Sequence, residues 1–305
     1  MGVLTLSYTS KIRYFVRKLY CMSKSLLTAL IALATLACSA QYTINQDLLL
    51  NTILLTYPNG VTGSGIILSD SPNIYLATAR HMVYGTDLTK DVLMGRTVQV
   101  TAYAGSLHAL RTNVFTIDLQ QSRDSGYILV DAKNDAAVIF IAKKFGDLLG
   151  YPETILKENR GRINLVSIEL IKPYDAVEVG AHVFVMGYPT SIGLNAGLVE
   201  SDKPLICKGA VAGFNEHTRR IVINAPVYHG NSGGPVFATY PMENRTCLIG
   251  VVTDFVPYLS DVLKKEANQV KTDSVRAVVN NTAFGIVTPA DNILTLIRQL
   301  KQHLP

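Results

Sequence analysis

Short runs of β-favouring residues recur from residue 52 onward, and they constrain the fold more than any other feature of the sequence. Val, Ile, Tyr, Phe and Thr dominate these runs, while Gly, Pro, Asn and Asp separate them. The expected strands are 52–56, 65–68, 74–78, 97–103, 127–130, 137–141, 182–186, 205–211, 220–224, 236–239 and 248–253. Strands and helices do not alternate regularly, which argues against a parallel α/β sheet. An antiparallel barrel or sandwich is favoured.

Helical signals are few and gather at the C-terminus. Pro289 occupies a first-turn position, and an apolar stripe follows it at Ile293, Leu294, Ile297 and Leu300. We therefore expect a helix that closes the chain, with shorter helices after His81 and near 261–269. The boundary between two halves is expected near 143–172, where Gly, Lys, Glu and Asn are frequent.

Residues 1–40 have the layout of a secretory signal peptide. Lys24 precedes an apolar run over 26–37, and the small residues Cys38 and Ala40 permit cleavage after Ala40. The sequence therefore predicts a secreted or periplasmic protein. Two alternatives remain open: lipidation of Cys38, and an uncleaved anchor. Met22 is a second candidate start, which would leave residues 1–21 outside the native protein.

The charge of the chain is concentrated in this leader. The whole sequence carries 28 Lys and Arg against 23 Asp and Glu, and five of the basic residues precede residue 41, where no acid occurs. The remainder is balanced, which argues against nucleic acid as a partner. A membrane partner is expected only if the leader is retained or Cys38 is lipidated.

Two cysteines lie in the body of the chain. Cys207 and Cys247 form either one disulfide, as in many exported proteins, or two buried thiols. No Cys or His cluster has zinc-ligand spacing. No metal or cofactor is expected.

The hexapeptide Gly-Asn-Ser-Gly-Gly-Pro at 230–235 is the strongest chemical signal. Glycines beside a serine allow unusual backbone angles that can aim two amides at one point. Such paired donors form an oxyanion hole, each contributing about 10²–10³ in rate. The motif predicts Ser232 as a nucleophile, with the amides of Gly230 and Ser232 as the donors.

A serine hydroxyl needs a base, and the base needs a carboxylate. His81 follows an apolar strand and a group of small residues, with a second strand expected at 63–68 to pair with the first. Asp135 opens a strongly apolar strand, where an acid requires a partner. We take His81 as the base and Asp135 as its carboxylate, with Asp131 as the reserve candidate.

Together these segments resemble the chymotrypsin-like (trypsin-like) serine peptidases. The order His81, Asp135, Ser232 is the order of that family, with gaps of 54 and 97 residues. The resemblance implies an all-β fold of two six-stranded antiparallel barrels, about 48–145 and 172–305, in one peptidase domain spanning 41–305. The active site would lie between the barrels and a helix would follow. Within the family the chain resembles the bacterial exported branch of high-temperature-requirement proteases, without their PDZ domains.

The resemblance extends to the substrate cleft. Residues 183–189 resemble the first strand of the second barrel, 248–254 the strand that edges the cleft, and 283–287 the last strand. Thr253 matches a family serine that bonds the catalytic aspartate. The backbone of Thr253, Asp254 and Phe255 would pair with an extended substrate.

Two departures from the family affect activation and specificity. Asn231 replaces the aspartate that zymogen-type members use to bind a new N-terminus, so no such activation is expected. Pro226 occupies the place of the pocket acid in Arg- and Lys-specific members, and Val252 that of a histidine in Glu-specific members. We expect an apolar or small residue at the cleaved position, with Tyr228 and His229 lining the pocket.

The sequence thus predicts an exported serine endopeptidase that acts on polypeptides through an acyl-enzyme. The alternative is a catalytically silent peptidase-fold binding protein, in which an apparent insertion at 86–126 covers the cleft. An esterase with the same triad is a third possibility. The α/β-hydrolase order, with serine before histidine, does not occur.

Overall fold

The computed structural model describes residues 46–304 except 88–89, 107–108, 146–147, 158–162, 191–199, 201, 244 and 262–276. These residues all belong to one compact unit, Asn45–Pro305. The expected signal peptide and Cys38 lie outside the described residues, as does nearly all of the helix expected at 261–269. In the part of the chain that is described, no helix is long and apolar enough to cross a membrane.

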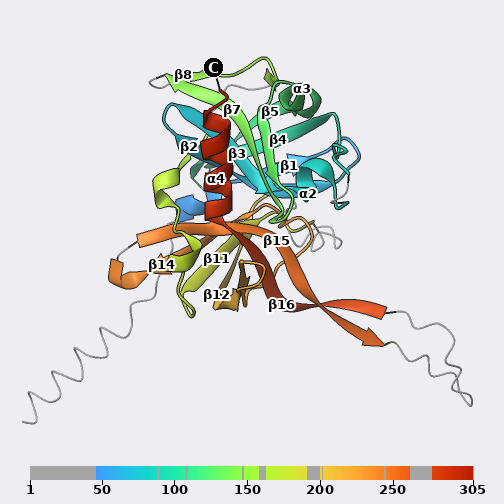
Figure 1. Cartoon of the computed structure of the whole chain (residues 1–305), viewed down its shortest axis with the longest axis vertical. Coiled ribbons are helices and arrows are strands. Elements are labelled where there is room, and N and C mark those ends of the chain that lie inside the picture. Colours follow the sequence, from blue (N-terminus) through green and yellow to red (C-terminus); the bar gives the residue numbers. More distant parts are fainter. Residues whose placement is uncertain are drawn as a thin grey trace, which may run out of the picture. The chain divides into compact units, whose positions relative to one another are not determined.

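The first half of the unit is a half-barrel built from one ten-stranded sheet (Figure 1). The strands pair in the order β6-β7-β3-β2-β1-β4-β5-β9, with β8 added to β7 and β10 to β2. The pairing of β10 with β2 is parallel, and the others are antiparallel. The strands are β1 (Thr52–Thr56), β2 (Thr62–Asp70), β3 (Asn73–Ala79), β4 (Thr97–Ser106), β5 (Ala109–Asp118), β6 (Ile128–Asp131), β7 (Ala136–Phe145), β8 (Leu148–Gly150), β9 (Ile155–Lys157) and β10 (Val166–Ser167).

Because this sheet does not close, the expectation of a six-stranded N-terminal barrel is wrong. Closure requires a hydrogen-bonded ladder between the two edge strands. Here the edges are the short strands β6 and β9, and helix α3 (Leu119–Asp124) packs against β4, β5 and β6. Asp118 starts α3 by accepting a 2.9 Å bond from the Gln121 amide through its side chain. The chain after β5 continues directly as α3, and β6 and β9 stay unpaired with each other.

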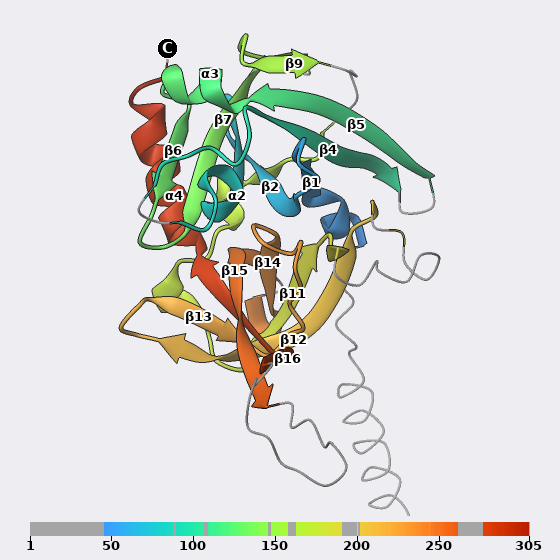
Figure 2. The ribbon, with the colours of Figure 1, turned by 90° about the vertical axis from the view of Figure 1, so that its right-hand side faces the viewer.

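The second half is a closed six-stranded barrel, as expected (Figure 2). Its strands pair in the order β11-β12-β13-β16-β15-β14. β15 and β16 are long, and their paired ends extend beyond the barrel as a ribbon (Figure 1). The strands are β11 (His182–Gly187), β12 (Leu205–Asn215), β13 (Arg220–Ile223), β14 (Pro235–Tyr240), β15 (Arg245–Asp261) and β16 (Ala277–Pro289).

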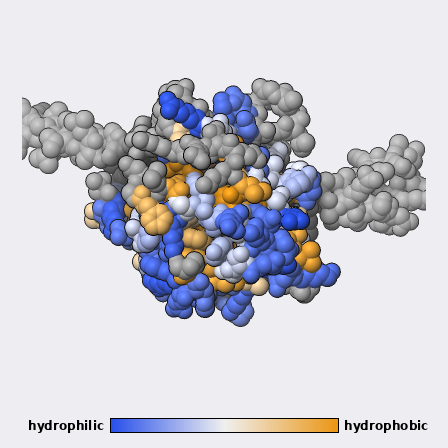
Figure 3. Space-filling view, turned by 90° about the horizontal axis from the view of Figure 1, so that it is seen from above, coloured by the Kyte–Doolittle hydropathy of each residue, from blue (hydrophilic) through white to orange (hydrophobic). Residues whose placement is uncertain are grey.

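Each half has its own hydrophobic core. Strand β13 illustrates how the barrel core is formed. Its alternate residues Ile221 and Ile223 point into the core and are buried, while their neighbours in the strand are half-buried. In the first half, β3 and the start of β7 are buried on both faces, and the start of β7 reads as a continuous apolar run. Seen from above, the outer surface is mostly hydrophilic around smaller hydrophobic areas (Figure 3).

The expected C-terminal helix is α4 (Ala290–Lys301). Its buried stripe repeats every three or four residues, at Ile293, Leu296, Ile297 and Leu300. α4 packs against β6 and β7 of the first half and against β15 and β16 of the second. The helix therefore joins the two halves, and it follows directly from the last strand.

The remaining elements are short. The helix expected after His81 is α2 (His81–Tyr84). Four 3-10 helices complete the described chain: η1 (Gln46–Asn51), η2 (Ile168–Leu170), η3 (Tyr174–Ala176) and η5 (Pro241–Glu243). Cys207 and Cys247 are free thiols, so of the two possibilities left open by the sequence the structure has the unbridged one. Burial raises the pKa of both.

Candidate active site

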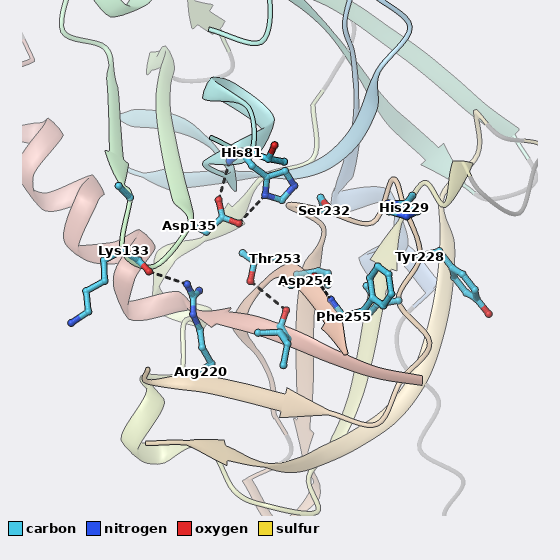
Figure 4. Close-up of a pocket in the computed structure, with 15 residues that line it drawn as sticks. His81, Lys133, Asp135, Arg220, Tyr228, His229, Ser232, Thr253, Asp254 and Phe255 are labelled. Carbon is cyan, nitrogen blue, oxygen red and sulfur yellow. Dashed lines mark hydrogen bonds and ion pairs between the residues drawn. The ribbon is translucent and has the colours of Figure 1, made fainter. Parts of the chain in front are cut away.

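A pocket of about 460 Å³ opens between the half-barrel and the barrel (Figure 4). Both halves contribute to its wall, and residues far apart in the sequence meet there. It is lined by His81, Thr86, Ala132, Lys133, Asp135, Arg220, Val227, Tyr228, His229, Ser232, Val252, Thr253, Asp254, Phe255 and Ile286. His81, Asp135 and Ser232 are therefore brought to one pocket.

His81 is positioned by the buried strand β3, which ends two residues before it. Its ring Nδ1 lies 2.8 Å from Asp135 Oδ2, and its backbone amide donates a 2.9 Å bond to Asp135 Oδ1. Both side chains are largely covered, with 17% and 19% of their surfaces exposed. When Nδ1 carries the proton and donates a hydrogen bond to Asp135, Nε2 has a free lone pair and can act as a base.

Asp135 sits at the end of the turn that leads into β7. It has a φ of 51°, a left-handed conformation that Asp adopts more readily than most residues. Its carbonyl accepts a 3.1 Å bond from the Arg80 amide, so the turn is tied to the chain beside His81. The carboxylate is thereby held facing the imidazole.

The reserve candidate Asp131 has a different place. Its carboxylate accepts bonds from the backbone and side-chain nitrogens of Asn134, at 3.0 and 2.7 Å, and from Asn292 Nδ2 at 3.2 Å. It does not line the pocket. Asp131 therefore caps the turn and contacts α4, while Asp135 faces the imidazole.

Ser232 lies on the side of the His81 ring that faces away from Asp135 (Figure 4). Its side chain is partly exposed to the pocket. Among the described residues, no hydrogen bond joins its hydroxyl to the ring. Such bonds are often long before substrate binds. The arrangement leaves the hydroxyl free to turn toward Nε2.

The turn before Ser232 carries the two amides expected to form an oxyanion hole. The Asn231 amide donates a 3.0 Å bond to the Tyr228 carbonyl, and Gly230 has a φ of 96°. This is a type II turn, which places a positive φ at its third residue. The amides of Gly230 and Ser232 donate to no other described residue, so both are available as the two donors of an oxyanion hole.

Gly230 is required here for space as well as for φ. A Cβ at this position would lie 2.2 Å from the Tyr188 carbonyl oxygen and 2.8 Å from the Thr190 amide. The catalytic turn therefore packs directly on the backbone that follows β11. Asn231 is 1% exposed, and its amide group lies against Gly187.

The residues expected to bind substrate are mostly, but not all, in the pocket. The pocket is lined by Tyr228, His229, Thr253, Asp254 and Phe255, as expected. Pro226 does not line the pocket, whereas its neighbour Val227 does. The rings of His229 and Phe255 meet edge to face, with centroids 5.7 Å apart. The lining residues that sequence reasoning missed include Ile286, which pairs with Asp254 across β15 and β16. The sequence placed both 248–254 and 283–287 in strands of the second barrel, so pairing these two strands would have brought Ile286 to the cleft.

Thr253 does not take the role suggested by the family resemblance. Its hydroxyl donates to the Ile286 carbonyl at 3.4 Å and accepts a 3.3 Å bond from the Thr288 hydroxyl. No hydrogen bond to Asp135 occurs among the described residues. The loop beside Asp135 is instead contacted by Arg220, which the sequence did not single out.

Arg220 extends from β13 to the turn that precedes Asp135. Its guanidinium donates to the Asn134 carbonyl at 2.5 Å, to the Lys133 carbonyl at 3.2 Å and to the Thr288 hydroxyl. Burial lowers the pKa of Arg220, and the nearby carboxylate of Asp135 opposes that shift. This arginine therefore links the barrel to the half-barrel next to the candidate catalytic pair.

Comparison with known proteins gives a family and two structural likenesses. A family model described as a trypsin-like peptidase domain matches residues 63–240, more than half of the chain. A search of curated proteins found no match. The chain is similar to Deg5 in its crystal structure, with 18% sequence identity and a TM-score of 0.47. The match covers 84% of this chain and 90% of the Deg5 chain. A structure of the HtrA-type protease AlgW with a tripeptide is 16% identical, with a TM-score of 0.45. It covers 83% of this chain, which spans 60% of AlgW.

Proposed function

The chain belongs to the trypsin-like peptidase family, and from this premise we propose that it is an exported serine endopeptidase working through His81, Asp135 and Ser232. The observation that carries the proposal is the double contact between His81 and Asp135, at 2.8 and 2.9 Å, on the wall of the pocket that also holds Ser232. Export rests on the leader sequence alone.

In the first step the Ser232 hydroxyl oxygen attacks the carbonyl carbon of the scissile peptide bond. His81 Nε2 accepts the hydroxyl proton, and Asp135 stabilises the imidazolium that forms. The negative charge on the carbonyl oxygen is received by the amides of Gly230 and Ser232. General-base catalysis of this kind supplies about 10²–10⁴ in rate.

The second half of the reaction reverses these roles. The imidazolium of His81 gives its proton to the leaving amine as the peptide C–N bond breaks, which leaves an ester between Ser232 and the acyl part. A water molecule, deprotonated by His81, then attacks the ester carbonyl. Ser232 regains its proton as the acid product departs.

The pocket favours an apolar or small side chain at the cleaved position. Val227, Val252 and Ile286 contribute apolar surface to its wall. Neither Pro226 nor these residues could neutralise a buried Arg or Lys side chain, whose charge would be costly without a partner. Asp254 also lines the pocket, and its Oδ1 accepts a 2.8 Å bond from the Phe255 amide. We expect apolar or small residues to be cleaved in preference to Arg and Lys.

The binding-protein alternative depended on residues 86–126 covering the cleft. Residues 97–106 and 109–118 of that segment form β4 and β5 of the half-barrel. Of its described residues, Thr86 alone lines the pocket. The accessible pocket supports the peptidase over the silent binding protein.

The experiment is hydrolysis of a peptide library by the purified protein, with products identified by mass spectrometry. We expect cleavage after apolar or small residues, and loss of cleavage in Ser232→Ala. Asp135→Asn should lower kcat by about 10⁴-fold, because an amide cannot hold the required tautomer of His81. A folded wild-type protein that cleaves nothing would refute the proposal, and a profile dominated by Arg, Lys or Glu would refute the specificity.

A further inference from the structure

Ser64, a buried residue of β2 in the half-barrel, contacts the catalytic turn of the barrel. Its hydroxyl donates a 2.7 Å bond to the Gly230 carbonyl and accepts a 3.0 Å bond from the Tyr188 amide. Its backbone amide donates a 2.9 Å bond to the Ser232 carbonyl. The side chain is 0% exposed, so these bonds are shielded from water. One residue thus bonds the chain on both sides of Asn231.

Thr190 holds the same turn from another direction. Its backbone amide and its hydroxyl donate to the His229 carbonyl, at 3.0 and 3.3 Å. The carbonyl of His229 and the amide of Gly230 belong to one planar trans peptide and point in opposite directions. Holding the carbonyl on Thr190 therefore directs the Gly230 amide to the opposite side.

The turn has an alternative in which this amide is lost to the site. Rotation of the peptide between His229 and Gly230 would convert the type II turn into a type I turn. Glycine accepts both conformations, so Gly230 itself does not choose between them. The rotation would break the two bonds from Thr190 and bring the His229 carbonyl to the place of the amide. An oxyanion would then meet a carbonyl oxygen instead of a donor.

The second donor is fixed in a similar way. The amide of Ser232 shares a peptide with the Asn231 carbonyl, which accepts a 2.8 Å bond from the Gly234 amide. Ser64 binds the carbonyls of the two neighbouring peptides, at Gly230 and Ser232. Each peptide of the catalytic turn from His229 to Ser232 therefore has its carbonyl occupied away from the pocket.

We propose that Ser64 and Thr190 are positioning residues that keep the oxyanion hole formed before substrate binds. The inference rests on the proposed peptidase function. It adds that the half-barrel, through Ser64, sets the orientation of donors that the barrel supplies. Neither residue contacts the reacting atoms, so both act through the peptides of Gly230 and its neighbours.

The test compares Ser64→Ala with Ser122→Ala in the full chain. Ser122 is equally buried, lies in α3 and makes no hydrogen bond through its hydroxyl to the described residues. The substrate is a peptide p-nitroanilide whose cleaved residue is taken from the library profile. Ser64→Ala should lower kcat by about 10²-fold with KM unchanged, because an oxyanion donor contributes about that much in the transition state only. Ser122→Ala should match wild type.

A second readout separates positioning from general damage. The matching peptidyl trifluoromethyl ketone forms a hemiketal with Ser232, and the oxyanion hole lowers the pKa of that hemiketal. NMR titration of the labelled ketone carbon should show a higher hemiketal pKa in Ser64→Ala than in wild type. Thr190→Val should lower kcat by about fivefold, the effect of one lost hydrogen bond. Thr190→Ser, which keeps the hydroxyl, should have the kcat of wild type.

The outcomes are distinct. If wild type neither cleaves the substrate nor binds the ketone, the proposed peptidase function fails. If wild type does both, and Ser64→Ala has the same kcat and hemiketal pKa, the positioning role is refuted. A rise in KM alone would also refute it. Should Ser64→Ala fail to fold, Thr190→Val decides, since Thr190 is only half-buried, and an unchanged kcat there would overturn the inference.

Discussion

The guanidinium of Arg220 donates a 2.5 Å hydrogen bond to the carbonyl of Asn134, the residue that precedes Asp135. The two residues are 86 positions apart and belong to different halves of the molecule. The bond is charge-assisted and half-buried, which makes it stronger than a neutral surface contact. It ties the position of Asp135 to the barrel that carries Ser232.

Replacing Arg220 by Met should therefore reduce both stability and rate. Removing a charged hydrogen-bond donor should cost about 1.5–3 kcal/mol of unfolding free energy. A displaced Asp135 turn should lower kcat by about tenfold, since small misplacements of catalytic groups are expensive. Denaturant unfolding and peptide hydrolysis measure the two effects.

The neighbouring arginine supplies the control. Arg219 is exposed and lies 3.6 and 3.7 Å from Asp175 and Asp291. Surface pairs of this kind contribute about 0–1 kcal/mol. Arg219→Met should leave kcat unchanged. Equal rate losses in the two variants would contradict a specific role for Arg220.

Gly230→Ala should abolish activity, whereas Gly126→Ala should not. Both glycines have a positive φ, of 96° and 71°. A Cβ on Gly126 meets nothing within 4 Å, while one on Gly230 would lie 2.2 Å from the Tyr188 carbonyl. Gly126→Ala therefore loses only about 1–2 kcal/mol of backbone preference. Hydrolysis by a folded Gly230→Ala protein at the wild-type rate would contradict the assignment of this turn.

Phe255→Ala should shift cleavage toward larger apolar residues. The Phe255 ring lines the pocket and contacts His229, so its removal enlarges the space for the substrate side chain. The ratio of kcat/KM for Phe over Val should rise by about tenfold or more, as for other changes of pocket volume. Phe284→Ala, on an exposed residue outside the pocket, is the matched control. An unchanged cleavage profile in Phe255→Ala would place the specificity elsewhere.

Alkaline pH should destabilise the fold through buried tyrosines. Burial raises the pKa of Tyr75 and of Tyr240 from 10.0 to about 12. Between pH 10 and 12 the unfolded chain therefore loses protons that the folded chain retains, and stability falls as pH rises through this window. Denaturant unfolding at pH 9, 10 and 11 should show the decline, and it should be smaller in Tyr75→Phe. A constant free energy of unfolding from pH 9 to 11 would contradict this role of the buried tyrosines.

The candidate triad could be predicted from sequence because each member lies in a local pattern. Ser232 stands among glycines, and His81 and Asp135 stand at the ends of apolar strands. The C-terminal helix could be predicted for the same reason, from its apolar stripe and from the proline at its start. Such signals depend on residues close together in the chain.

The features that could not be predicted depend on residues distant in sequence. Ser64 and Arg220 reach the site only because two halves pack together, and nothing beside them in the chain marks that contact. The half-barrel stays open because its edge strands β6 and β9 do not pair, and strand edges are a long-range property that no single strand's sequence reveals. Thr253 matched a family position, yet its hydroxyl is bonded to Thr288 and Ile286.

The most direct test of the account is covalent labelling of the purified protein with a fluorophosphonate, followed by mass spectrometry of the labelled peptide. Such a probe reacts with a serine that an adjacent base has activated. We predict one label, on Ser232, which is absent in Ser232→Ala and strongly reduced in His81→Ala. A folded wild-type protein that takes no label, or takes it on another serine, would contradict the central claim.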